Sequence, residues 1–291
     1  ASACEGPTAR LAAAPDTGHR LALHTGLPVV PARRLADTVD VSDPIAYDAQ
    51  PRRPAWGVRL PRRKALSTRL PILVAPPPAI ACISLAQGPG PAARASVAVG
   101  QQVLRGEPIG EPAEPGLPRV HASISGRVTG VEPRPVAGSG IAVPCVVIGG
   151  SGADDRWPGY APDPAAATRP PEVIRDGIAA AGVPGLGGAL YPAARKLEIG
   201  AGAPLLLLNG VECEPYISCD DMLIRERADV VVAGARLLLA ALGGRRCVIA
   251  VKTDMPEARV ALYHAIQAAG DPRLALSVVT GKYPAGGERQ L

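Results

Sequence analysis

Residues that carry charge or permit unusual backbone geometry are concentrated in four stretches of the C-terminal half. Residues 182–196 contain a cluster of glycines and end at Lys196, and residues 209–221 read Asn-Gly-Val-Glu-Cys-Glu-Pro-Tyr-Ile-Ser-Cys-Asp-Asp. Residues 252–254 read Lys-Thr-Asp, and residues 281–288 read Gly-Lys-Tyr-Pro-Ala-Gly-Gly-Glu. Closely spaced glycines let backbone N–H groups approach a phosphate. These residue types therefore predict a site for a phosphate-bearing ligand, bordered by carboxylates and a lysine.

Short apolar runs separated by helical patterns place three of these stretches at one edge of a sheet. The pattern predicts strands at 204–208, 247–251 and 274–279 and helices at 171–181, 222–242 and 256–269. Apolar strands that alternate with helices indicate a parallel, Rossmann-like α/β sheet covered on both faces, and Asp254 is expected to cap the last helix. Ligands of such sheets bind beyond the carboxyl ends of the strands. The acidic stretches begin at those ends.

The N-terminal half is predicted to hold a small all-β domain. Residues 70–148 are short β-like pieces punctuated by glycine and proline. The pattern V-x-V-G-x-x-V-x-x-G, followed by HASISGRV, resembles the barrel-sandwich hybrid of lipoyl and biotinyl domains. Those carriers attach their group to a lysine at a hairpin tip, but the matching hairpin here carries Ser123 to Gly126, with no lysine. We therefore expect this domain to be structural.

Composition divides the chain into four parts. They are an irregular lead-in at 1–50, the β-rich domain at 51–150, a linker rich in Pro, Asp and Ala at 151–170, and the α/β domain at 171–291. The α/β part stops directly after its third acidic stretch, so we expect the sequence to be a portion of a longer protein.

Charge and cysteine content exclude several function classes. The net charge is +5, aromatic residues are 3% of the chain, and basic residues are not interleaved with aromatics, so no nucleic-acid partner is expected. No stretch of the sequence approaches the ~20 apolar residues of a membrane helix, and we expect none of it to act as a secretory signal. Six cysteines without a C-x-x-C pair predict neither a disulfide framework nor a complete metal site within this chain. Cys213 and Cys219 could be metal ligands, but two thiols need two more partners, so we interpret them as small buried hydrophobic residues.

An arginine-rich segment precedes the β domain. Between residues 51 and 69 the chain has six arginines, Lys64 and no acid. One interpretation is a solvated basic segment, and the other is a docking surface for an acidic partner or an anionic membrane face. The sequence alone leaves both open.

Three motifs together resemble the RnfC family, which belongs to the Rnf electron-transport complex. They are GVPGLGGALYPAARK at 182–196, NGVECEPYISCDDMLIRE at 209–226 and KYPAGGERQL at 282–291, and the upstream HASISGRV segment is similar to that family's N-terminal β domain. The resemblance covers residues 55–291. The same α/β core resembles the flavin-carrying NADH dehydrogenase subunit of respiratory complex I.

The resemblance implies a site for FMN and NADH with no catalytic side chain, because the cofactors carry out the hydride transfer. The implied binding residues are Gly185, Gly187, Gly188, Tyr191, Lys196, Asn209, Glu212, Glu214, Tyr283, Gly286 and Glu288. The glycines would lie against the flavin or nucleotide, and Lys196 would hold a phosphate or a flavin oxygen. Val211 departs from the complex I relative, which has an acid there, so part of that flavin contact is absent.

The resemblance also implies a role for the whole protein. It would oxidise NADH and pass electrons through FMN to two 4Fe–4S clusters, located C-terminal to this sequence, and on to ferredoxin or in reverse. It would be a peripheral subunit on the cytoplasmic face of the bacterial inner membrane, in contact with the membrane and iron–sulfur subunits of the Rnf complex. Two alternatives are a corrin (cobalamin) reductase of the same superfamily and a non-catalytic docking subunit.

Overall fold

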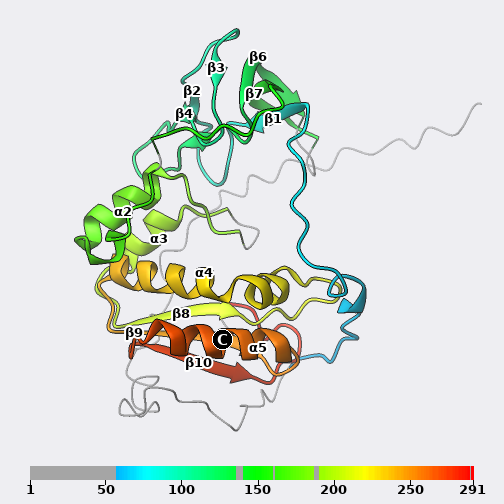
Figure 1. Cartoon of the computed structure of the whole chain (residues 1–291), viewed down its shortest axis with the longest axis vertical. Helices are drawn as coiled ribbons and strands as arrows, with labels where there is room; N and C mark the ends of the chain where they lie inside the picture. Colours follow the sequence, from blue (N-terminus) through cyan, green and yellow to red (C-terminus); the bar gives the residue numbers. More distant parts are fainter. Residues whose placement is uncertain (1–56, 136–139, 160, 187–189, 289) are drawn as a thin grey trace, which may run out of the picture. The chain divides into compact units, whose positions relative to one another are not determined.

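Two antiparallel sheets form the N-terminal half of the described chain (Figure 1). The computed structural model describes residues 57–135, 140–159, 161–186, 190–288 and 290–291; the expected lead-in and two expected site residues, Gly187 and Gly188, lie outside these ranges. The sheets have the strand orders β1-β7-β6-β3 and β2-β4-β5. The strands are β1 (Ile80–Ser84), β2 (Arg94–Ala95), β3 (Gln102–Val103), β4 (Pro108–Glu111), β5 (Val120–His121), β6 (Gly126–Pro135) and β7 (Ala142–Gly150).

The core of this β domain is built from small and branched aliphatic side chains. Val103, Ile109, Val120, Val146 and Ile148 are at most 1% exposed and belong to one cluster between the sheets. Alternate residues of each strand face this cluster, as the period of a β-strand requires. The predicted all-β domain is therefore confirmed.

The expected hairpin at Ser123 to Gly126 is wrong. Strands β5 and β6 belong to different sheets, so the residues between them cross from one sheet to the other. Ser125 is 4% exposed, and its hydroxyl accepts a hydrogen bond from Arg105 N (2.9 Å) and donates one to Asp155 O (2.5 Å). At Gly126 a Cβ atom would lie 2.0 Å from the carbonyl oxygen of Gly149, so only glycine fits this crossing. Ser123 is exposed, whereas Ile124, Ser125 and Gly126 are buried.

The C-terminal half contains a parallel three-stranded sheet with the order β10-β9-β8. Its elements are β8 (Leu205–Gly210), α4 (Cys219–Leu242), β9 (Arg246–Lys252), α5 (Pro256–Ala269) and β10 (Leu274–Val279). They are preceded by η2 (Ala166–Thr168), α2 (Pro171–Ala180) and α3 (Ala193–Ile199). The predicted order of strands and helices is confirmed, and α4 begins three residues earlier than its apolar pattern predicts.

Both crossover helices lie on the same face of this sheet. Residues of α4, including Val232 and Leu239, and residues of α5, including Leu262, share one core cluster with alternate residues of the strands. The strand order follows the sequence order in one direction, and right-handed crossovers then place every helix on one side. The expectation of helices on both faces is therefore wrong for the described residues, and Leu207 on the opposite face is 40% exposed.

The longest helix ends where its sequence changes to glycine. α4 stops at Leu242, and Gly243 adopts a left-handed conformation (φ 68°), which L-residues with a side chain rarely adopt. The equivalent residue after α5 is Gly270 (φ 58°). Among the described residues no helix is both long and apolar enough to cross a membrane.

Truncation of Leu262 tests the core beneath α5. Leu262 is fully buried, so Leu262→Ala should lower the free energy of unfolding by about 2–5 kcal/mol because it leaves a cavity. Val260, on the same helix, is 55% exposed, and Val260→Ala should change it by less than about 0.5 kcal/mol. Urea titration followed by circular dichroism measures both. Equal losses in the two variants would contradict the assigned packing.

Candidate functional site

The loops that follow β8 and β10 are in direct contact. Asn209, near the end of β8, accepts a hydrogen bond from Val211 N on its side-chain oxygen (3.0 Å) and donates one from its amide nitrogen to Gly286 O (2.6 Å). A Cβ atom at Gly286 would lie 1.9 Å from the carbonyl oxygen of Val211. The close approach of the two loops therefore requires glycine at position 286, which is one of the predicted site residues.

The glycine-rich stretch meets the loop after β10 through a pair of charges. Lys196 Nζ lies 3.5 Å from Glu288 Oε1, and the two side chains are 70% and 85% exposed. In this stretch Gly185 N donates a backbone hydrogen bond to Tyr191 O (2.8 Å). Solvent screens an exposed pair, so this one contributes little stability and both side chains are available to a ligand.

A buried ion pair fixes the loop between β8 and α4. Lys64, in the 3-10 helix η1 (Lys64–Leu66), extends its ammonium to Glu212, 3.1 Å from Oε2 and 3.0 Å from the backbone oxygen. The two side chains are 6% and 2% exposed. Burial of either charge alone would cost several kcal/mol, so each depends on the other.

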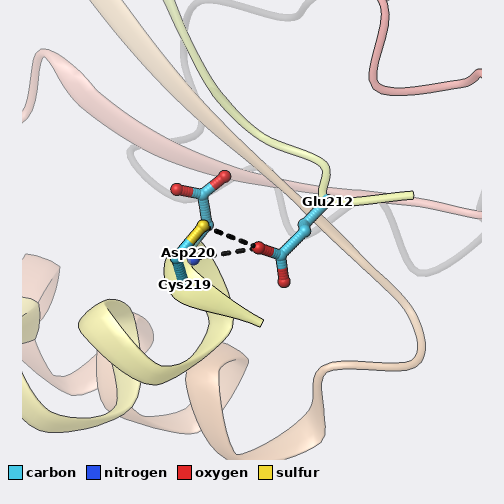
Figure 2. Close-up of side chains that lie close together, drawn as sticks. All are labelled: Glu212, Cys219 and Asp220. Carbon is cyan, nitrogen blue, oxygen red and sulfur yellow. Dashed lines mark hydrogen bonds between the residues drawn. The ribbon is translucent and has the colours of Figure 1, made fainter. Parts of the chain in front are cut away.

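The second carboxylate oxygen of Glu212 is used at the start of α4 (Figure 2). Glu212 Oε1 accepts hydrogen bonds from Asp220 N (3.1 Å) and from the Cys219 thiol (3.2 Å). Desolvation and then the charges of Glu212 and Glu214 raise the pKa of Asp220. Desolvation and the hydrogen bond to Glu212 raise the pKa of the Cys219 thiol. Negative charge is therefore concentrated at this helix end, and the Lys64 ammonium offsets part of it.

Residues 58–72, which we call the N-terminal strap, contact all three loops at the carboxyl ends of the strands. Val58 and Tyr283 exchange two backbone hydrogen bonds of 2.9 Å, which joins the strap to the loop after β10. Arg62 Nε lies 2.9 Å from Asp254 Oδ2, in the loop after β9. Together with Lys64, these contacts attach one segment to every loop at that edge of the sheet.

The strap contains most of the described part of the arginine-rich segment, for which the sequence left two interpretations open. Lys64 is 5% exposed, so the interpretation of a wholly solvated basic segment is wrong for this residue, whereas Arg59, Arg63 and Arg69 are exposed. Asp254 is paired with Arg62 and with Lys252 Nζ (3.3 Å) and makes no cap: the residue that precedes α5 is Met255, without a side-chain cap. In the sequence, Lys64 stands out only because lysine is rare in this chain, and that rarity does not identify Glu212 as its partner.

The remaining predicted site residues have partly or fully exposed side chains. Tyr191 and Tyr283 are 37% and 40% exposed. Glu214 is exposed and accepts a hydrogen bond from Cys213 N (3.1 Å) on its carboxylate. The structure thus brings Lys196 to Glu288 and Asn209 to Gly286, and it directs Glu212 toward Lys64.

Glu212, Cys219 and Asp220 are the one group of three potential metal ligands found among the described residues. Their ligand atoms lie within 4.8 Å of one another. The ammonium of Lys64 already contacts Glu212 and would repel a bound cation. We therefore interpret the group as an internal hydrogen-bond network.

Comparison with known proteins finds a match for each half of the chain. Residues 54–153 match the RnfC barrel sandwich hybrid domain, and residues 178–291 match the Nuo51 FMN-binding domain. The RnfC proteins of the ion-translocating oxidoreductase complexes of Yersinia enterocolitica and Pseudomonas aeruginosa are 37% and 40% identical over 81% of this chain. The chain spans 33% and 30% of those two proteins, about a third of their length.

The chain is also similar to a solved structure, an NAD+-reducing nickel–iron hydrogenase in the H2-reduced state. The two are 25% identical in sequence, and the similar region covers 45% of this chain and 26% of the hydrogenase chain, with a TM-score of 0.37. The sequence resemblance to the RnfC family is confirmed by the matches over both domains.

Substitution of Gly286 tests the contact between the two loops. Gly286→Ala should lower the free energy of unfolding by about 1–3 kcal/mol, because the new methyl group collides with the Val211 carbonyl. Gly234, within α4, has open space at its Cβ position, and Gly234→Ala should raise stability by about 0.5–1 kcal/mol through helix propensity. Thermal melts of the two variants should move in opposite directions, and a neutral Gly286→Ala would refute the close approach.

Proposed function

The chain is a homologue of the RnfC proteins, and from this relationship we propose that it forms the FMN- and NADH-binding part of an electron-transferring subunit of an ion-translocating oxidoreductase. The observation that carries the proposal is the convergence of Lys196, Asn209 and Gly286 at the carboxyl edge of a parallel sheet, within the stretch that matches an FMN-binding domain.

The residues at this edge suit a planar, anionic ligand. Lys196 offers an exposed positive charge, and Asn209 offers an amide that both donates and accepts hydrogen bonds. Tyr191 and Tyr283 offer partly exposed aromatic faces, and Gly185 allows close approach of the backbone. Phosphate and ring oxygens need cations and N–H donors, and a flat ring system needs apolar or aromatic walls. The donor set therefore fits FMN.

Glu212 does not fit a direct cofactor contact. Both of its carboxylate oxygens are occupied by Lys64, Cys219 and the backbone of Asp220, and its side chain is 2% exposed. Glu214, with its exposed side chain, is the better candidate to contact a nucleotide hydroxyl. We keep Gly187 and Gly188 as proposed contacts on the sequence motif alone.

Each group at the site has a defined part in binding. Bound FMN supplies the exchange between two-electron hydride chemistry and single-electron transfer. Lys196 would stabilise negative charge on the bound ligand, with Glu288 as its partner in the free protein. Asn209 would orient the ring through its amide, and Glu214 would orient ribose hydroxyls of NADH. The protein's contribution is alignment and charge, and it needs no acid or base of its own.

The wider role is proposed for the longer protein. Two 4Fe–4S clusters would lie C-terminal to residue 291 and would carry electrons toward ferredoxin or in reverse. The partners would be the membrane and iron–sulfur subunits of the complex, with this protein peripheral to the cytoplasmic face of the inner membrane. The shared name of the curated relatives, which assigns them to an ion-translocating complex, supports this proposal.

Lys196→Gln should weaken FMN binding about tenfold or more, because a hydrogen bond to a charged group contributes about 1.5–3 kcal/mol. Arg195 is the neighbouring exposed cation on the same helix, so Arg195→Gln is the matched control and should leave the affinity unchanged. Quenching of FMN fluorescence on titration with the purified protein measures both dissociation constants.

The decisive measurement adds NADH to the FMN-loaded protein without oxygen and follows the visible flavin absorbance. Bleaching at a rate that depends on NADH concentration would support the proposal. Retention of no FMN by the full-length protein, or FMN that NADH does not bleach, would refute it.

A further inference from the structure

The N-terminal strap supplies a residue that positions the flavin loop, which is the segment 211–218 between β8 and α4. We propose that Lys64 is a positioning residue for this loop and that Glu212 is its internal anchor. The identity of the ligand that meets this loop, FMN, rests on the function proposed above, whereas the anchoring of the loop by Lys64 does not depend on it. The geometry at Lys64, at the start of α4 and at Tyr216 supports the inference.

Lys64 contacts Glu212 in two places. Its ammonium lies 3.1 Å from the carboxylate and 3.0 Å from the backbone oxygen of the same residue. If Lys64 contacted only the backbone oxygen of Glu212, the Glu212 side chain could still rotate relative to that backbone. Two contacts at one residue fix both the backbone and the carboxylate of Glu212. Because both partners are buried, the interaction is weakly screened by salt.

Glu212 passes this constraint to helix α4. Ser218 precedes the helix and makes no capping hydrogen bond with its side chain. The carboxylate of Glu212 takes that place and accepts from the backbone N–H of Asp220 (3.1 Å). A negative charge at the N-terminus of a helix is stabilised by the unpaired N–H groups there. The anchor therefore joins the strap, the flavin loop and α4.

The far end of the flavin loop is held by the same strap. Tyr216 N donates to Arg62 O (2.9 Å), and the hydroxyl of Ser67 donates to Tyr216 O (3.0 Å). Tyr216 has a positive φ of 66°, which costs energy for a residue with a side chain and persists where its surroundings hold it. Strap contacts at both Glu212 and Tyr216 fix the course of the loop between them.

Removal of one charge tests the anchor. Lys64→Met should weaken FMN binding about tenfold or more, because it leaves the Glu212 carboxylate buried and uncompensated, and the loop must move to hydrate it. Arg63→Met removes the neighbouring exposed charge and should leave the affinity unchanged. Fluorescence titration with FMN measures each dissociation constant.

Removal of both charges separates positioning from packing. In Lys64→Met combined with Glu212→Gln no buried charge is left unpaired, whereas each single substitution leaves one, so the FMN affinity of the double variant should exceed that of either single variant. If Glu212 were itself a flavin contact, the second substitution would weaken binding further. The double variant also keeps the test decisive where Lys64→Met does not fold.

The thiol of Cys219 gives a second readout that needs no flavin. It is exposed, it donates to Glu212, and the charges that face it are Glu212, Asp220 and, through Glu212, Lys64. Iodoacetamide alkylates the thiolate form of Cys219. Loss of the Lys64 ammonium removes a positive charge and should shift the pH dependence of the alkylation rate to higher pH. Simple loosening of the fold would hydrate the thiol and shift this dependence to lower pH. Peptide mass spectrometry assigns the modified cysteine.

The two readouts distinguish failure of this inference from failure of the proposed function. A Lys64→Met variant with the FMN affinity and the Cys219 profile of the unaltered protein would overturn the anchor. Likewise, a double variant that binds FMN more weakly than Lys64→Met would return Glu212 to the flavin contacts. A protein that retains no FMN but shows the expected Cys219 shift would refute the flavin function and support anchoring by Lys64.

Discussion

The geometry of the candidate site depends on the buried ion pair between Lys64 and Glu212. Each charge is nearly inaccessible to water, with 6% and 2% of its side chain exposed, so neither is stable there without the other. The carboxylate also binds the first turn of α4, so its orientation is set from two sides. A ligand that uses the loop between β8 and α4 meets a surface whose shape this pair has already determined.

The need for such a constraint follows from the architecture of the sheet. Both crossover helices pack on one face, and the strand residues that point to the other face are covered near their carboxyl ends by loop residues such as Val211 and Ala285. Loops bury little apolar area and are therefore the least stable elements of a domain. Attachment to the N-terminal strap, to one another and to α4 gives them the rigidity that helices would otherwise supply.

Elements and site residues were predictable from sequence to different degrees. The strands and helices followed from apolar periodicity, because burial on one face imposes a period that local composition records. The sequence placed Asn209 and Gly286 at the same edge of the sheet but did not predict the hydrogen bond between them. The pairing of Lys64 with Glu212 joins residues 148 positions apart, and a lysine in an arginine-rich segment carries no mark of its partner. The face on which the helices lie depends on strand order, which periodicity does not specify.

The strap also joins the two matched halves of the chain by ion pairs. The stretch that matches the FMN-binding domain, 178–291, contains all three strand-end loops, whereas the strap lies within 54–153, the stretch that matches the RnfC-type domain. An FMN-binding domain excised at residue 178 would keep Glu212 buried without Lys64 and Asp254 without Arg62. The RnfC-type half therefore contributes electrostatic partners to the site, and its role extends beyond that of a separate structural domain.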